Sequence, residues 1–200
     1  MFFINPIGFL ISPYKYWLTM SELPLSAYRG LMLYPTLMAL LPAIAWYFGV
    51  TRIGWTVGDG AAVRLTSDSA LTVVVLFYIA MLSSISVIGY LTHWMSKTYQ
   101  AQTSLTKGIA VISLISTPLF FAGIVGIYPV LWLDLCVGML ALAWSLYLLY
   151  TGIPAVMKLP KEQGFLYASA VVGVAMVILI CIMVGSVILW DFGFAPVFID

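Results

Sequence analysis

The sequence predicts an all-α fold, a polytopic membrane helix bundle with five transmembrane helices and a short interfacial N-terminal segment. Composition is the first observation behind this prediction. The 200 residues are 64% hydrophobic and only 8% charged, whereas a soluble domain carries about 25% charged residues. A soluble globule of this composition would expose an apolar surface and aggregate. The second observation is a series of apolar runs close to the roughly 20 residues that cross a bilayer. The length fits one domain over residues 1–200.

Residues 1–30 are expected to form a cytoplasmic or interfacial segment rather than a span. They are apolar and aromatic, but Pro6, Pro13 and Pro24 interrupt them. No uninterrupted run here reaches the roughly 20 residues that a span needs. Aromatic side chains such as Trp17 favour the headgroup level of a membrane.

The spans and their connections follow from the remaining apolar and polar stretches. The five spans are expected at residues 31–50, 70–91, 108–127, 130–150 and 165–190. Pro35 and Pro42 predict kinks in the first span. A loop is expected over Thr51–Asp68, with a turn at Gly58–Gly60. A polar linker is expected over Thr92–Lys107.

The distribution of basic residues predicts the orientation. With five spans, the N-terminus and the second and fourth connections lie on one side of the membrane. That side carries six basic residues: Lys15, Arg29, Lys97, Lys107, Lys158 and Lys161. The other side carries Arg52 and Arg64. Because short basic loops remain cytoplasmic, we expect a multi-pass protein of the inner (plasma) membrane with its N-terminus inside and its C-terminus outside.

Polar and small residues recur inside three of the spans. In the fourth span, Asp134, Gly138, Ala141 and Ser145 share one helix face. The candidate polar intramembrane site contains Asp134, Ser83, Ser113, Ser116 and Thr117. Such faces commonly serve close helix packing and interhelical hydrogen bonds; the alternative is a polar path for a small solute. Asp134 lies about one turn from the outer end, so it either reaches the interface or forms part of a site.

The sequence offers no residues for catalysis, for a cofactor or for a metal. Cys136 and Cys181 both lie in apolar spans, and with a single histidine a zinc site has almost no ligands. No second intramembrane carboxylate accompanies Asp134 for acid–base chemistry, and no Gly-x-Ser-x-Gly motif is present. The net charge of +1 predicts no nucleic-acid partner.

The connection between the fourth and fifth spans resembles a known family. Leu146–Tyr167 reads LYLLYTGIPAVMKLPKEQGFLY, which is similar to the bacterial members of the Ypt-interacting-protein (Yip) family. The matching positions are Tyr147, Tyr150, Gly152, Pro154, Met157, Lys158, Pro160 and Tyr167. Two shorter stretches also resemble the family, Ile11–Trp17 (ISPYKYW) and Ser116–Pro118.

The resemblance implies a five-span bundle with a cytoplasmic N-terminus. Eukaryotic relatives are linked to small GTPases and vesicle traffic and tend to form homomeric and heteromeric complexes. Asp134 belongs to no family pattern, so the resemblance implies no role for it. Since a bacterium lacks that traffic, the family indicates fold rather than activity.

The family-motif turn also carries an expectation about local structure. Gly152 is expected to end the fourth helix in a left-handed conformation. Pro154 and Pro160 are expected to keep the helix from continuing.

Two functions fit these observations. One is a non-enzymatic scaffold or adaptor whose partners are the lipid bilayer and other membrane proteins or a second copy of itself. The alternative is a small-solute or ion permease with a polar path between spans two, three and four. A water-filled pocket lined by Ser83, Ser113, Ser116 and Asp134 would favour transport, and a solid core would favour the scaffold.

Overall fold

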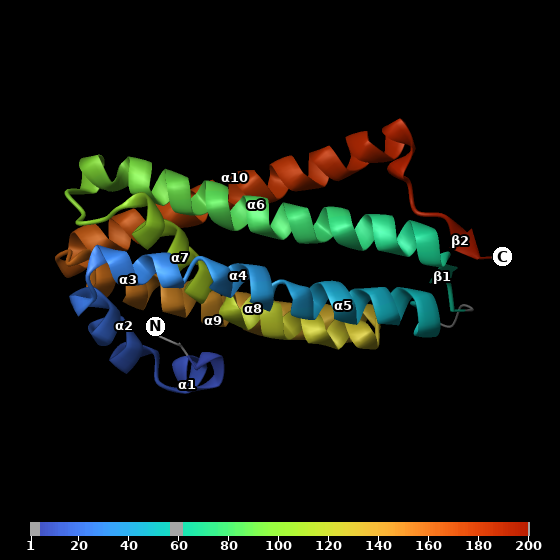
Figure 1. The fold of residues 1–200 in the computed structure, drawn as a ribbon, viewed down its shortest axis with the longest axis horizontal. Helices are drawn as coiled ribbons and strands as arrows, with labels where there is room; N and C mark the ends of the chain where they lie inside the picture. Colours follow the sequence, from blue (N-terminus) through green and yellow to red (C-terminus); the bar gives the residue numbers. More distant parts are fainter. Residues whose placement is uncertain (1–4, 57–61, 200) are drawn as a thin grey trace.

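The computed structural model describes residues 5–56 and 62–199 of the chain. Long helices run side by side along one axis and form an elongated bundle (Figure 1). Among these residues, four helical segments are long and apolar enough to cross a membrane, and a bent pair makes a fifth when its two halves are taken as one span. The predicted all-α membrane helix bundle is therefore confirmed.

The first span is a chain of short helices rather than one rod. It covers Leu25–Ile53 and consists of α3 (Leu25–Gly30), α4 (Leu33–Met38), α5 (Leu40–Phe48) and the π-helical turn η1 (Gly49–Ile53). Pro35 and Pro42 have no N–H to donate to the carbonyl one turn earlier, and the helix is interrupted about one turn before each of them. The expected kinks appear as these two interruptions.

The second span, α6, is a continuous helix from Ser67 to Tyr99. It begins at Thr66, whose side chain accepts a hydrogen bond from the Ser69 N–H. It ends at Gln100, which adopts a left-handed conformation with φ of 55°. The prediction that a polar linker begins at Thr92 is therefore wrong, because α6 continues from Thr92 to Tyr99.

The third span is broken and lies at the centre of the bundle. It consists of α7 (Leu105–Ile115), α8 (Thr117–Ala122) and the 3₁₀ turn η2 (Gly123–Ile127). Most of α7 is buried. The second half bends away from α7 by 41°. The bend lies at Ser116, two residues before Pro118, whose ring disfavours continuation of the preceding helix.

The fourth span, α9 (Leu131–Met157), runs further than expected. Gly152 and Pro154 lie inside this helix, so the prediction that it ends at Gly152 is wrong. The residue that adopts the left-handed conformation is Lys158, with φ of 55°. The N–H groups of Lys158 and Leu159 both donate to the Pro154 carbonyl, which closes the helix end as in a Schellman motif.

The fifth span combines α10 (Lys161–Leu189) with the π-helical turn η3 (Trp190–Phe194). A short tail returns from it to the start of α6. In the tail, β2 (Phe198–Ile199) pairs antiparallel with β1 (Arg64–Leu65). The Val197 N–H also donates to the Ser69 Oγ at 2.8 Å. The sequence did not predict this strand pair, and the expected Gly58–Gly60 turn lies outside the described residues.

The N-terminal segment is packed into the bundle. It forms α1 (Pro6–Ile11) and α2 (Pro13–Glu22), and α2 lies against α9. Phe9, Trp17 and Met20 are completely buried. The expectation that Trp17 faces the headgroups is wrong, because this indole belongs to the core.

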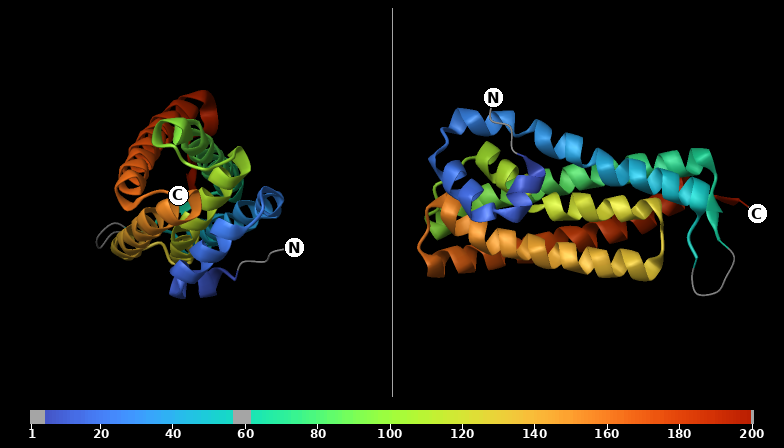
Figure 2. Two further views of the ribbon diagram at one scale, coloured as in Figure 1. Left: turned by 90° about the vertical axis from the view of Figure 1, so that its left-hand side faces the viewer. Right: turned by 90° about the horizontal axis from the view of Figure 1, so that it is seen from below.

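The two ends of the bundle differ (Figures 1 and 2). One is the basic end, and the other is the strand end. The basic end gathers α2, α3, the last turn of α6, the first turn of α7, and the turn between α9 and α10 with the first residue of α10. These elements carry all six of the basic residues assigned to one side from the sequence: Lys15, Arg29, Lys97, Lys107, Lys158 and Lys161. The strand end carries η1, the β1–β2 pair and the start of α9.

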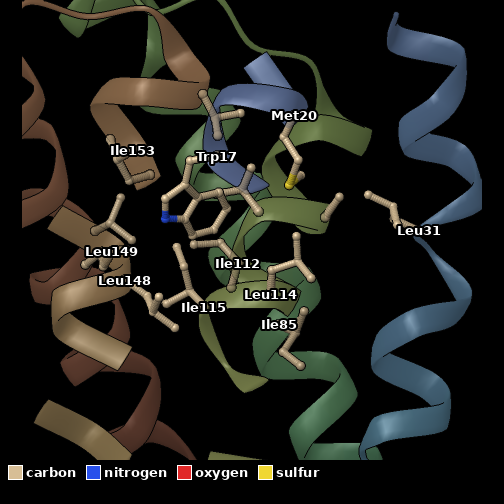
Figure 3. Close-up of a cluster of buried hydrophobic side chains, with 14 of the residues drawn as sticks. Trp17, Met20, Leu31, Ile85, Ile112, Leu114, Ile115, Leu148, Leu149 and Ile153 are labelled. Atoms are coloured by element: carbon tan, nitrogen blue, oxygen red, sulfur yellow. The ribbon is translucent and has the colours of Figure 1, made fainter. Parts of the chain in front are cut away.

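The larger core cluster extends from the basic end into the middle of the bundle. Figure 3 shows Trp17 between the Leu148–Ile153 stretch of α9 and residues of α7 such as Ile112. A smaller cluster of Val50, Leu65 and Ala70 lies at the strand end. On α10, the last buried residue is Val171, so the remainder of that helix runs along the outside of the bundle.

Candidate functional site

The structure brings together only part of the predicted polar site. Ser113, Ser116 and Thr117 lie around the break in the third span. Ser83 lies on the exposed side of α6, and Asp134 lies half-buried in the first turn of α9 at the strand end. The predicted set is therefore divided between the centre and the periphery of the bundle.

The hydroxyl groups at the break are already paired. The Ser113 Oγ donates to the Ile109 carbonyl at 2.7 Å, and the Ser116 Oγ donates to the Ile112 carbonyl at 2.9 Å. Thr117 is fully buried, and its Oγ1 lies 2.7 Å from the Tyr34 hydroxyl on α4. These bonds tie the break to its own helix and to the first span.

Two apolar hollows flank α10. The α6-side hollow has a volume of about 410 Å³ and lies between α5, α6, α8 and α10. The α9-side hollow has a volume of about 470 Å³ and lies between α7, α8, α9 and α10. Five residues line both of them: Ile88, Ser116, Leu119, Ala175 and Leu179. The two hollows therefore meet beneath the middle of α10, at the break in the third span.

The break explains why these hollows exist. The 41° bend at Ser116 turns α8 toward α5 and α9. Meanwhile α10 continues along α6 and α9. Figure 1 shows α10 diverging from the lower helices toward the strand end. The side chains between α10 and the bent span are too small to fill the space, and the two hollows remain.

The α9-side hollow opens sideways. Four of the residues that line it are also among the exposed apolar residues: Leu119 at 41%, Leu142 at 52%, Met176 at 60% and Leu179 at 59%. Since these side chains lie on membrane-spanning helices, the opening faces the lipid phase rather than water.

Polar contacts at the basic end link separate elements. The Tyr28 hydroxyl donates to the Met20 carbonyl, and the Tyr167 hydroxyl donates to the Thr92 carbonyl. The Lys107 ammonium donates to the Gln102 carbonyl at 2.9 Å. These bonds join α3 to α2, α10 to α6, and α7 to the preceding connection.

Lys107 is unusual because it is a buried cation. Only 7% of its surface is exposed, and its Nζ lies 5.8 Å from the centre of the Tyr28 ring. A cation over an aromatic face gains electrostatic stabilisation, more so when it is desolvated. Gln102, which accepts from Lys107, in turn donates its N–H to the Met157 carbonyl at 3.2 Å. The basic end is thus closed by a continuous set of contacts.

The first half of the family-motif turn packs against neighbouring helices. The Tyr150 hydroxyl lies 3.0 Å from the Ser169 Oγ on α10. A Cβ added at Gly152 would lie 2.7 Å from the indole of Trp17. Gly152 is therefore required for the close approach of Trp17 rather than for a left-handed turn.

The second half of the turn joins α9 to α10. Pro154 packs against Gly164, where an added Cβ would lie 2.5 Å from the proline Cβ. Met157 is completely buried. Lys158 ends α9, and Pro160 is the N-cap of α10 with ψ of 150°. The turn residues therefore set the angle between the last two spans.

Sequence reasoning missed the residues that connect helices at the basic end. It assigned Lys107 to a linker and gave Tyr28 and Tyr34 no role. One feature could have indicated them: each lies in an apolar stretch where a tyrosine hydroxyl or an ammonium group needs an internal partner. Within residues 5–56 and 62–199, no group of three or more His, Cys, Asp or Glu side chains could hold a metal ion.

Comparison with known proteins places the chain in a family. The Yip1 domain matches residues 7–182. The chain belongs to the Yip1 domain family. Two relatives carry the description inner membrane protein YohC, one from Escherichia coli strain K12 and one from Escherichia coli O6:H1 strain CFT073. Each is 37% identical to this Yip1 domain protein over 158 residues, covering 79% of this chain and 81% of the relative. No solved structure matches the chain.

Proposed function

We propose that this Yip1 domain protein is a non-enzymatic scaffold or adaptor of the inner membrane that acts through contacts with membrane proteins or lipids. One observation carries the proposal. The hydroxyls at the break in the third span are bonded within the protein, whereas the strand-end half of α10 presents an open apolar surface. The strand-end half of α10 is therefore a surface suited to apolar contacts with lipids or other membrane proteins.

The permease alternative has less support. The hollows beneath α10 have almost entirely apolar walls, and neither Ser83 nor Asp134 lines them. Ser116 does line both, but its hydroxyl already donates to the Ile112 carbonyl. In the α9-side hollow the buried Ser145 hydroxyl has no hydrogen-bond partner among the described residues, and a single hydroxyl does not make a polar path. Moving a polar solute past such walls would leave its hydrogen bonds unmade, which is costly in an apolar medium.

We also propose that the basic end faces the cytoplasm. The six basic residues gathered there support this orientation, because short basic connections are retained inside. A reporter active only in the cytoplasm should function when fused near Lys161 and fail when fused after Asp200. The opposite pattern would reverse the orientation.

A paired experiment separates the two functions. A photoreactive amino acid placed at exposed Ile180 on α10 should give discrete protein adducts in cells if the chain is a scaffold. The same label at buried Leu148 serves as the control and should give none. In parallel, vesicles containing the purified protein should show no solute flux above empty vesicles. Flux that Thr117→Val or Ser116→Ala abolishes, without protein adducts, would establish the permease instead.

A further inference from the structure

We infer that the joined hollows beneath α10 hold an acyl chain of a glycerophospholipid, which enters sideways between α9 and α10. This inference deepens the proposed lipid-contact role and rests on it. The hollows lie at the depth of the spans, and the α9-side hollow is open to the surroundings at Leu142, Met176 and Leu179. A ligand from the aqueous phase at the basic end has no comparable route, since that end is closed by the core.

The chemistry of the walls selects an alkyl chain. Apart from Ser84, Ser116 and Ser145, the side chains that line the two hollows are apolar. The hydroxyls of Ser84 and Ser116 donate to the Ala80 and Ile112 carbonyls, and the buried Ser145 hydroxyl of the α9-side hollow is the one without a hydrogen-bond partner in the described part of the chain. Water would find too few partners here, because a buried water needs several hydrogen bonds.

The size of the hollows suits a small or slender occupant. Their volumes are about 410 and 470 Å³. They fall within the range of about 300–1,000 Å³ that is usual for small-ligand sites.

Close packing against the walls, rather than the hydrophobic effect, would hold the acyl chain in the hollows. Lipid tails are as apolar as the walls, so transfer from the bilayer gains little. An empty hollow, however, leaves its lining without partner atoms and loses their dispersion contacts. An acyl chain that fills the space beneath Ala175 restores those dispersion contacts.

Photolabelling tests the inference directly. The probe is a phosphatidylethanolamine with a diazirine on one acyl chain, mixed into vesicles that contain the purified full-length protein. Lipid around the bundle should label exposed residues such as Leu140 and Met183. A chain in the hollows should also label the Ser116–Leu119 segment. Because Leu119 is itself 41% exposed, the label that decides is the one on Ser116, which is half-buried and lines both hollows. Label confined to the exposed positions would overturn the inference.

A matched pair of variants shows where the acyl chain lies. Ala175→Phe fills the junction of the hollows and should lower labelling of Ser116–Leu119 by about tenfold. Val177→Phe adds the same ring to an exposed position on α10 that lines neither hollow and should leave that labelling unchanged. Equal labelling in both variants would contradict the inference. If Ala175→Phe does not fold, Ala175→Leu replaces it, and the labelling pattern of the parent protein still decides the question.

The outcome is distinguishable from failure of the proposed function. A permease would show solute flux whether or not Ser116–Leu119 is labelled. A scaffold without a bound chain would give protein adducts at Ile180 and an unlabelled Ser116–Leu119 segment.

Discussion

The two halves of the bundle are held together in different ways. At the basic end, helices from every part of the chain surround Trp17, Tyr28 and Tyr167, which are completely buried. Toward the strand end, α10 has no buried residue after Val171 and is fastened by its tail through β1 and β2. In water, an open apolar half would be costly, but in a bilayer lipid covers it at little cost. The difference distinguishes a packed half that maintains the fold from an open half, which in the proposed function meets lipids or partners.

The largest expected effect comes from emptying the core of the basic end. Trp17→Ala should destabilise the purified protein by about 3–5 kcal/mol, because a large buried side chain leaves a cavity. Trp132 is 74% exposed on α9, so Trp132→Ala is the matched control and should change stability by less than about 0.5 kcal/mol. Melting curves in one detergent compare them. Similar losses for both would mean that the two halves are equally packed.

The second-largest effect is expected from overpacking the contact between Gly152 and Trp17. Gly152→Leu places a side chain into the Trp17 indole and should cost about 1–3 kcal/mol or more. Gly138 lies on the same helix with nothing within 4 Å of an added Cβ, so Gly138→Leu should be tolerated. If the Gly138 variant melts lower than the Gly152 variant, the assignment of the packed half is wrong.

Loss of a single hydrogen bond should have a smaller effect. Tyr167→Phe leaves the buried Thr92 carbonyl without this donor and should cost about 1 kcal/mol. Tyr147 is exposed on α9, so Tyr147→Phe should be close to neutral. The free energies of unfolding of the two variants, measured in one detergent, give the comparison. Equal values would show that the buried bond does not stabilise the basic end.

The smallest effect is expected at the charged turn. Lys158→Gln and Lys161→Gln remove exposed charges and should each change stability by less than about 0.5 kcal/mol. Unfolding of either variant under conditions where the parent is folded would show that charge rather than packing holds the turn.

Labelling of the native cysteines sharpens the description of the open half. Cys136 and Cys181 are both exposed on spans, where the surrounding phase is lipid. In vesicles they should react slowly with a water-soluble maleimide, because a reagent that stays in water does not reach side chains covered by lipid. A membrane-permeant maleimide should reach them sooner. Rapid reaction of either with the water-soluble reagent would indicate a wet cavity in the strand-end half.

The sequence predicted the fold class well because composition and span length are set by the bilayer. Pro35 and Pro42 predicted interruptions because a missing N–H acts locally. The helix ends were harder to predict: Gln100 and Lys158 adopt left-handed conformations, which glycine normally supplies. No local pattern indicated these two residues.

The candidate site was predicted less completely, for a physical reason. The role of Gly152 depends on Trp17, which is far away in the sequence, and a local reading assigned the glycine to a helix end instead. The hollows depend on how the bend at Ser116 is placed against α10, which no periodicity shows. Ser116 and Thr117 were identified from their hydroxyls, yet their actual neighbours became visible only in three dimensions.

Distances between spin labels test the contrast between the halves most directly. In a variant without native cysteines, one pair would join Leu140 on α9 to Met183 on α10, in the open half. The other pair would join Tyr147 on α9 to Phe165 on α10, nearer the basic end. All four side chains are exposed, so the labels should not disturb the core. A fixed basic half and an open strand-end half predict a narrow distribution for Tyr147–Phe165 and a broad one for Leu140–Met183 that shifts between detergent and bilayer. Two equally narrow distributions that do not depend on the lipid would contradict this account.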